Sequence, residues 1–262
     1  MEFDQNLYSR QIGTYGLETM GKLISLRVFI QGLRGIGIEV AKNLILAGPK
    51  QVVLQDSNKV EIRDLGCNFY LQEADVGKAS RAEASLRQLR DLNPYVKVEV
   101  HDAEVTEDFL SNFDVVVFTD SYDVDKLIKF NNFCRNRDKP IGFIYTGLLG
   151  LYGFTFVDFG PKFACLDATG EDPKSAIISN ITCEATGIVT THEDKRHGFE
   201  DGDTIVFKEV KGMSEINGQR YVIKVLSPFQ FSIGDTSAFG KYLQDGIAEQ
   251  IKVPTYINFK SL

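Results

Sequence analysis

Apolar runs and amphipathic stretches alternate from the start of the chain to about residue 159. Short apolar runs bounded by turn residues are typical of buried strands, and apolar positions that recur every three or four residues are typical of helices. Strands are expected over residues 27–32, 51–56, 96–102, 114–120 and 139–147, and helices over residues 8–25, 36–47, 75–92 and 126–137. This alternation predicts an α/β fold with a mostly parallel sheet and helices on both faces. Residues 151–160 are expected to add a short hairpin at the sheet edge.

The pattern changes after residue 163. A polar, turn-rich linker, DATGEDPK, leads into short alternating runs such as AIISNIT, DTIVFKEV and RYVIKVL, separated by turns such as EDGD and EING. Short strands at regular intervals indicate a small all-β sandwich or barrel. The predicted division is an α/β domain over residues 1–166, a linker over 167–176 and an all-β domain over 177–262.

The stretch FIQGLRGIGIEVAKN, residues 29–43, predicts a strand, a glycine-rich turn and a helix. In the dinucleotide fingerprint G-x-G-x-x-G, the first glycine makes the turn, the second lets the backbone approach the phosphates, and the third lets helix and strand pack closely. Gly32 and Gly37 fill the first and third positions, but Arg34 fills the second. Asp56 stands where an acidic residue would bind a ribose hydroxyl. The loop thus favours the fold but argues against phosphate binding, unless the Arg34 side chain points outward and itself binds phosphate.

Composition narrows the function further. The chain is 43% hydrophobic and 25% charged, so a packed core is expected. Its formal net charge of −7 argues against a nucleic-acid-binding surface, which needs a basic patch. No apolar run approaches the ~20 residues that cross a bilayer. We expect a soluble, intracellular protein that binds neither nucleic acid nor membrane.

The four cysteines carry no metal-binding signature. Their spacing includes no C-x-x-C pair, so no metal site is predicted. In a reducing compartment, buried free thiols are expected rather than disulfides. The cysteines are Cys67, Cys134, Cys165 and Cys183.

Several longer phrases resemble the N-terminal region of the ubiquitin-activating enzymes, the E1 family. LYSRQI, GLRGIGIEVAKNLILAG, NFYLQEADVGKASRAE and DLNPYVKV are similar to the inactive adenylation half of those enzymes. RHGFEDGDTIVFKEVKGMSEING and FSIGDTSAF are similar to their first catalytic-cysteine half-domain, a small β insert. The resemblance covers nearly the whole chain and implies a Rossmann-like fold of the ThiF/MoeB type. It also implies two adenylation halves packed together, of which only the other one binds Mg-ATP.

This chain departs from the active adenylation motif of that family at most charged positions. A second aspartate of D-x-D is replaced by Asn58, and a lysine of K-x-K by Ser80. Of the N-x-x-R-Q-F motif, the asparagine is Asp64 and the arginine is Cys67. Asp120 is retained. Adenylation needs Arg, Lys and Mg²⁺ to stabilise charge on the α-phosphate, so we expect a degenerate site and no catalytic residue in this chain. The positions of that site are Gly32, Arg34, Gly37, Asp56, Asn58, Cys67, Ser80 and Asp120.

The resemblance implies one residue that acts on ATP in the other half. The arginine of the family's S-R-Q phrase corresponds to Arg10, which would contact the ATP phosphates in trans. ATP and Mg²⁺ are then cofactors of the full enzyme, with none expected for this chain alone. The implied partners are ubiquitin, the remaining E1 domains and, through domains absent here, E2 conjugating enzymes.

Two alternatives remain open on sequence grounds. An autonomous nucleotide-binding enzyme, either a dehydrogenase or an adenylyltransferase, would use Arg34 for phosphate and Asp56 for ribose. A purely regulatory binding module would make no catalytic contribution through Arg10. The end of the sequence at INFKSL leads us to expect an N-terminal fragment of the enzyme.

Overall fold

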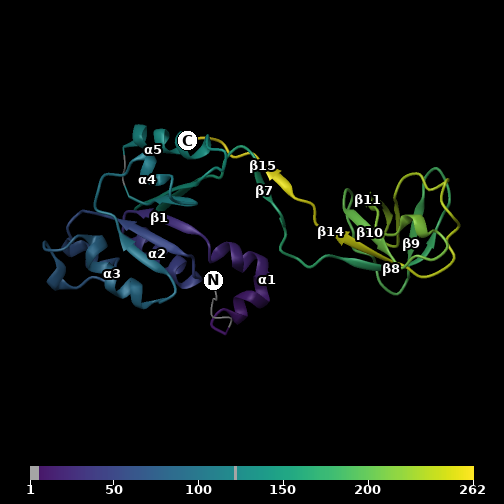
Figure 1. The fold of residues 1–262 in the computed structure, drawn as a ribbon, viewed down its shortest axis with the longest axis horizontal. Coiled ribbons are helices and arrows are strands. Elements are labelled where there is room, and N and C mark those ends of the chain that lie inside the picture. The colour runs from purple at the N-terminus through teal and green to yellow at the C-terminus, as the bar shows by residue number, and fades with distance from the viewer. Residues whose placement is uncertain (1–5, 121–122) are drawn as a thin grey trace. The chain divides into compact units, whose positions relative to one another are not determined.

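The computed structural model describes residues 6–120 and 123–262. Its contacts define two units (Figure 1): Met1–Phe163 together with Asn258–Leu262, and Ala164–Ile257. The division predicted from the sequence was 1–166, 167–176 and 177–262. Among the described helices, none is long and apolar enough to cross a membrane.

The first unit is a six-stranded sheet in the order β3-β2-β1-β4-β5-β6. All neighbours pair in parallel except β5 and β6, which form the antiparallel edge hairpin expected from the sequence. The α/β prediction is therefore confirmed. The strands are β1 (Arg27–Gln31), β2 (Gln51–Gln55), β3 (Lys97–Val100), β4 (Val115–Phe118), β5 (Gly142–Leu149) and β6 (Tyr152–Asp158).

Helices cover both faces of this sheet. Side chains that alternate along a strand point to opposite faces: Ile30 packs in the cluster that contains Ile38 and Leu89, whereas its neighbour Phe29 packs in the cluster that contains Leu127 and Phe130. The helices are α1 (Ser9–Leu23), α2 (Gly35–Ala47), α3 (Arg81–Asp91), α4 (Glu107–Leu110) and α5 (Val124–Arg135), with 3₁₀ turns η1 (Ile62–Gly66) and η2 (Glu73–Asp75).

The predicted long helix over residues 75–92 was wrong in its first turn and a half. The α3 helix begins at Arg81, because Ser80 is its N-cap. The Ser80 hydroxyl accepts a hydrogen bond from the Glu83 N–H at 3.2 Å, and the Glu83 carboxylate accepts one from the Ser80 N–H at 2.9 Å. This reciprocal capping box fixes where the helix starts.

The α1 helix is joined to the unit through Tyr8, which precedes it. The Tyr8 hydroxyl accepts a hydrogen bond from Asn93 at 2.9 Å and lies against Gly48, where an added Cβ would come within 2.5 Å of it. Gly16 breaks the helical geometry inside α1, with φ 78° and ψ 162°.

The second unit is a seven-stranded antiparallel sheet in the order β11-β10-β14-β8-β9-β13-β12. Its edge strands β11 and β12 are separated in sequence only by Ile223, which is 2% exposed, so the two edges lie close together and the sheet must curl. This agrees with the predicted barrel-like β domain. The strands are β8 (Ser175–Ile181), β9 (Ile188–Thr191), β10 (Thr204–Lys208), β11 (Arg220–Val222), β12 (Lys224–Ser227), β13 (Gln230–Ser232) and β14 (Ile247–Ile251), with 3₁₀ turn η3 (Ser214–Ile216).

The chain returns to the first unit after the β domain. A two-stranded sheet pairs β7 (Phe163–Cys165) with β15 (Thr255–Ile257). Beyond it, the Phe259 ring lies 5.6 Å from the ring of Phe159, and the Leu262 N–H donates to the Asn131 side chain at 2.8 Å.

Candidate functional site

The glycine-rich loop between β1 and α2 is held by close packing at two of its glycines. Gly32 has φ +88°, and an added Cβ would lie 2.7 Å from the Cβ of Asp120. A Cβ on Gly37 would lie 1.9 Å from the Gly32 carbonyl oxygen. By contrast, a Cβ on Gly35 would meet the Cys67 Cβ at 3.4 Å and the Cys67 carbonyl oxygen at 4.0 Å, which are ordinary contacts. The first and third glycines of the motif are therefore required by the fold itself, whatever the loop binds.

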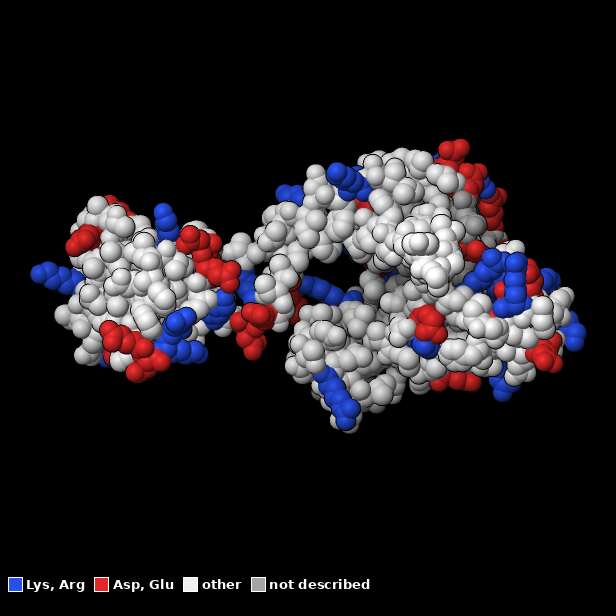
Figure 2. Space-filling model, turned by 180° about the vertical axis from the view of Figure 1, so that it is seen from behind, with Lys and Arg blue, Asp and Glu red and all other residues white. Residues whose placement is uncertain are grey.

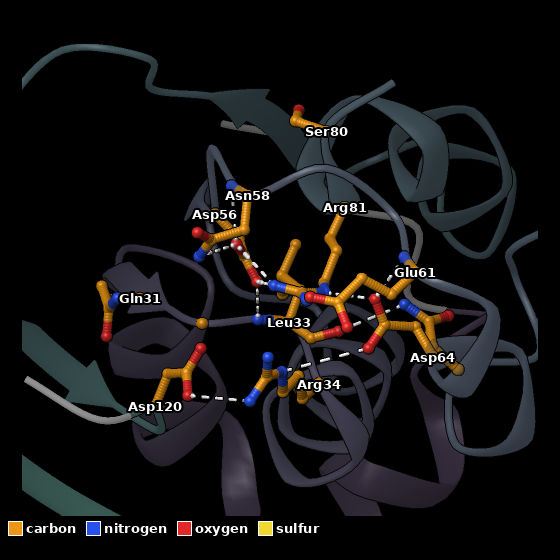
Figure 3. A network of polar contacts seen from close by, with 12 residues as sticks. Gln31, Leu33, Arg34, Asp56, Asn58, Glu61, Asp64, Ser80, Arg81 and Asp120 are labelled. Atoms are coloured by element: carbon orange, nitrogen blue, oxygen red, sulfur yellow. Dashed lines mark hydrogen bonds and ion pairs between the residues drawn. The ribbon is translucent and has the colours of Figure 1, made fainter. Parts of the chain in front are cut away.

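The Arg34 side chain lies between two carboxylates, those of Asp64 and Asp120 (Figure 3). Its Nε is 3.9 Å from Asp64 Oδ1 and its Nη1 is 3.8 Å from Asp120 Oδ1. The side chain is 41% exposed. Arg34 is the N-cap of α2, so its side chain stands at the helix N-terminus, where a phosphate would bind in a nucleotide site. The side chain points toward these protein carboxylates at ion-pair distances, although its Nε has no hydrogen-bond partner among the described residues.

The Asp56 carboxylate, predicted to bind ribose in a nucleotide enzyme, is fully engaged within the protein. Oδ2 accepts the Leu33 N–H at 2.9 Å, and Oδ1 accepts the backbone and side-chain N–H groups of Asn58 at 3.2 and 3.1 Å. Arg81 Nη1 approaches both oxygens, at 3.3 and 3.4 Å. With its side chain 1% exposed, Asp56 has no free lone pair to offer a sugar.

Arg81 is the central residue that sequence reasoning missed. Its side chain is 0% exposed, and its Nε donates to Asp64 Oδ2 at 2.6 Å. Nη2 lies 3.7 Å from Glu61. Burial disfavours the charged guanidinium, but hydrogen bonds and charge from Asp64 and Asp56 outweigh it, so the pKa of Arg81 is raised. Its position as the first residue of an amphipathic helix, next to a capping serine, was the available signal.

Asp64 is ionised in this network. Burial alone would favour its neutral form, but the Glu61 N–H and the Arg81 guanidinium together lower the pKa of Asp64 below its ordinary value.

The site as a whole brings together four carboxylates and two guanidinium groups, a formal net charge of minus two. They are Asp56, Glu61, Asp64 and Asp120, with Arg34 and Arg81.

The remaining positions predicted from the sequence divide between the site and the fold. Ser80 caps α3. Next to the predicted position Cys67, the buried Asn68 amide donates to the Leu33 carbonyl at 3.2 Å and so supports the loop. Arg10 is not part of the network: it is exposed in the first turn of α1.

A hollow of about 350 Å³ lies beside the loop. One wall is polar and includes Arg34 and Asp120, while Leu148, Leu149 and Phe154 of the β5–β6 hairpin form an apolar wall. An ATP phosphate chain entering here would meet the four carboxylates and two guanidinium groups described above, whose net charge is negative. The Leu33 N–H could not bind it, because that group already donates to Asp56. The residues present do not fit a bound Mg-ATP.

The cysteines differ from the expectation of four buried thiols. All are free, as predicted, but Cys67 and Cys183 are exposed and Cys165 is partly exposed. Cys134 alone is buried, and burial raises the pKa of its thiol to about 12. Among the residues that the structure describes, no cluster of three or more His, Cys, Asp or Glu side chains is placed to hold a metal ion.

Comparison with known proteins places these observations in a family. The family model described as the ubiquitin-activating enzyme E1 FCCH domain matches residues 184–252, within the β domain. Ubiquitin-activating enzyme E1 2 of Arabidopsis thaliana is 45% identical over 263 residues, and ubiquitin-like modifier-activating enzyme 1 of Homo sapiens is 46% identical over 262 residues. The chain is related to the ubiquitin-activating E1 enzymes along its whole length. It spans about 24% of the length of each of these relatives.

The match to E1 enzymes covers both units, as the sequence phrases implied. Among solved structures, the Escherichia coli tRNA N6-threonylcarbamoyladenosine dehydratase is similar over 54% of this chain and 59% of its own, at 20% identity and a TM-score of 0.46. The autonomous nucleotide-binding enzyme is not favoured, because both residues it requires, Arg34 and Asp56, are paired inside the protein.

Proposed function

We propose that this chain is the non-catalytic adenylation half and the first catalytic-cysteine half-domain of a ubiquitin-activating enzyme. The full enzyme would use ATP to adenylate the C-terminus of ubiquitin and then carry ubiquitin as a thioester. The observation that carries the proposal is the internal pairing of Asp56, whose oxygens accept from Leu33, Asn58 and Arg81.

The electrostatics of the loop explain why this half would not adenylate. Transfer to the α-phosphate requires preorganised positive charge around it. Here the positions that supply arginine and lysine in the active half are Cys67 and Ser80. The two guanidinium groups nearby are already paired with carboxylates. ATP and Mg²⁺ would therefore be bound by the other adenylation half.

Arg10 is the residue through which this chain would act on that ATP. It is exposed on the first turn of α1, a helix that Tyr8 anchors to Asn93 and Gly48. A planar, permanently charged guanidinium suits phosphate oxygens. An anchored backbone with a free side chain is what a contact in trans requires.

The β5–β6 hairpin offers a surface for packing on the other half. Large apolar side chains are well exposed there, with Leu149 at 72% and Tyr152 at 79%. Exposed apolar patches of this kind mark protein interfaces. The patch comprises Leu148, Leu149, Leu151, Tyr152 and Phe154.

The β domain would line part of the cleft that receives ubiquitin. E2 conjugating enzymes would bind through other E1 domains, in the cytoplasm and nucleus. Figure 2 shows Lys and Arg intermixed with Asp and Glu over the face in view, which supports protein partners rather than nucleic acid.

The test is Arg10→Ala in the full-length protein, measured as ATP-dependent formation of the ubiquitin thioester. We expect the rate to fall on the order of 10²–10³, the usual cost of removing one transition-state charge contact. Arg10→Lys should recover part of it. The matched control is Lys22→Ala on the same helix, whose exposed side chain pairs with Glu18 at 2.9 Å. An Arg10→Ala protein that charges ubiquitin at the wild-type rate would rule out the contact in trans.

A further inference from the structure

Arg81 occupies the centre of the degenerate site from within the protein. Its guanidinium bridges Asp56 at the end of β2 and Asp64 in η1, and its backbone begins α3. The two carboxylates are 1% and 2% exposed. One side chain thus joins three segments that surround the glycine-rich loop (Figure 3).

Two buried carboxylates need a cation beside them. Removing ionised groups from water is unfavourable unless they are paired and hydrogen-bonded. In nucleotide sites of this kind, metal ions and basic side chains held around the phosphates supply positive charge. Here the Arg81 guanidinium supplies the positive charge in place of an ion, and its fork geometry matches two carboxylates at once.

The same network leaves little for an external ligand to gain. The Leu33 N–H, which a phosphate-binding loop would offer to its anion, donates to Asp56 at 2.9 Å. Asn58 donates to the other oxygen of the same carboxylate. The loop is therefore ordered by its own side chains.

We infer that the Arg81 guanidinium is a built-in ligand, which replaces an external cation and keeps the loop in the same arrangement at all nucleotide concentrations. This rests on the proposed function, in which the loop has lost its nucleotide. By this inference, the α/β unit supports the other adenylation half and keeps the same structure whether or not ATP is present. The vacancy left by truncating Arg81 should then accept free guanidinium ion, a small molecule with the same charge and fork.

The experiment is a thermal melt of the α/β unit in the 262-residue chain, for Arg81→Ala and for Arg90→Ala as the matched control. Arg90 lies on the same helix, but its Nε donates to the Val98 carbonyl at 2.9 Å. We expect Arg81→Ala to lower the melting temperature by about 6 to 20 °C, because it leaves buried carboxylates unpaired. Guanidinium chloride at a low, non-denaturing concentration should raise it again by several degrees, relative to sodium chloride at the same ionic strength. The wild type and Arg90→Ala should show no such rise.

A second variant keeps the test decisive if Arg81→Ala does not fold. Arg81→Met should be much less stable than Arg81→Met combined with Asp56→Asn and Asp64→Asn, because the triple variant removes the unpaired charges together. Three results would overturn the inference: no specific guanidinium rescue in a folded Arg81→Ala, no gain in the triple variant, or wild-type stabilisation by Mg-ATP. Only the last result would also contradict the proposed loss of the nucleotide site. The first two would leave the expected outcome of the Arg10 experiment unchanged.

Discussion

The two units satisfy their buried polar groups in different ways. Among the described residues, the buried carboxylates and the buried arginine all lie in the α/β unit, whereas the buried polar side chains of the β domain are Thr191, His197 and Thr236. The core of the β domain is otherwise apolar and includes Phe207 and Phe231.

The difference fits the proposed function, in which the α/β unit has lost a ligand but kept the carboxylates of its site. In parallel α/β sheets, ligands bind at the carboxyl ends of the strands, and Asp56 and Asp120 follow β2 and β4 there. Those carboxylates remain, so the α/β unit depends on exact charge pairing. The β domain has no such group, so it depends on shape and on neutral hydrogen bonds. A different kind of substitution should therefore destabilise each unit.

The largest effect is expected from Gly37→Ala. Its new Cβ would lie 1.9 Å from the Gly32 carbonyl oxygen and 2.5 Å from the Thr119 hydroxyl oxygen, and the Gly32 contact is with backbone, which cannot move aside cheaply. We expect a loss of about 3 kcal/mol or more in the free energy of unfolding of the α/β unit, measured by amide hydrogen exchange in β1 and β4. The β domain should keep its protection.

The matched substitution is Gly35→Ala. Here the new Cβ makes ordinary contacts with Cys67, 3.4 Å from its Cβ and 4.0 Å from its carbonyl oxygen. Alanine favours helix over glycine by about 1 kcal/mol. Stability should change by no more than that. Equal costs at Gly35 and Gly37 would contradict the view that the third glycine is retained for packing while the close approach to phosphate is gone.

Most of the α/β fold could be predicted because its signals are local. Buried strands such as VVVF and the alternation with helices are readable in the chain, and so is the edge hairpin. The start of α3 could not be placed from periodicity alone, since residues 75–80 share the polar character of the helix that follows. The capping box of Ser80 and Glu83 decides it.

The residues around the loop could be predicted from the sequence, but the way they pair with one another could not. The positions of Gly32, Arg34 and Asp56 could be read from the motif. The pairing of Arg81 with Asp56 and Asp64 could not, because those residues are 25 and 17 positions apart and meet only through the tertiary fold. Buried charge has no periodic signature: an arginine in a helix is usually exposed.

A smaller effect, with a distinct pH dependence, is expected from Asp64→Asn. The amide keeps an acceptor for the Glu61 N–H but loses the charge that pairs with Arg81, which should cost about 1.5–3 kcal/mol at neutral pH. The folded-state pKa of Asp64 is lowered, so its contribution to stability is present above the unfolded pKa and is lost as pH falls through the folded value.

The wild-type α/β unit should therefore lose stability progressively below about pH 4, measured by calorimetry in steps of pH. Asp64→Asn should show a flatter curve. The slope should not vanish, because Lys139 and the Arg27 N–H outweigh burial to lower the pKa of Asp114 as well. Parallel curves for wild type and Asp64→Asn would mean that the pKa of Asp64 is not lowered in the folded protein.

Of the two substitutions that remove a buried polar group, the smaller effect is expected in the β domain, from Thr236→Val. The Thr236 hydroxyl is buried, donates toward the Thr182 carbonyl at 2.7 Å and accepts the Glu184 N–H at 3.2 Å. Valine preserves the shape and removes the hydroxyl, so the cost is that of leaving backbone groups unpaired, about 1–3 kcal/mol. Because no charge is involved, the loss should be the same at pH 7 and pH 4 and should be confined to exchange protection around β9 and β13. A loss that grows in acid would show that the β domain, like the α/β unit, is held by ionised groups.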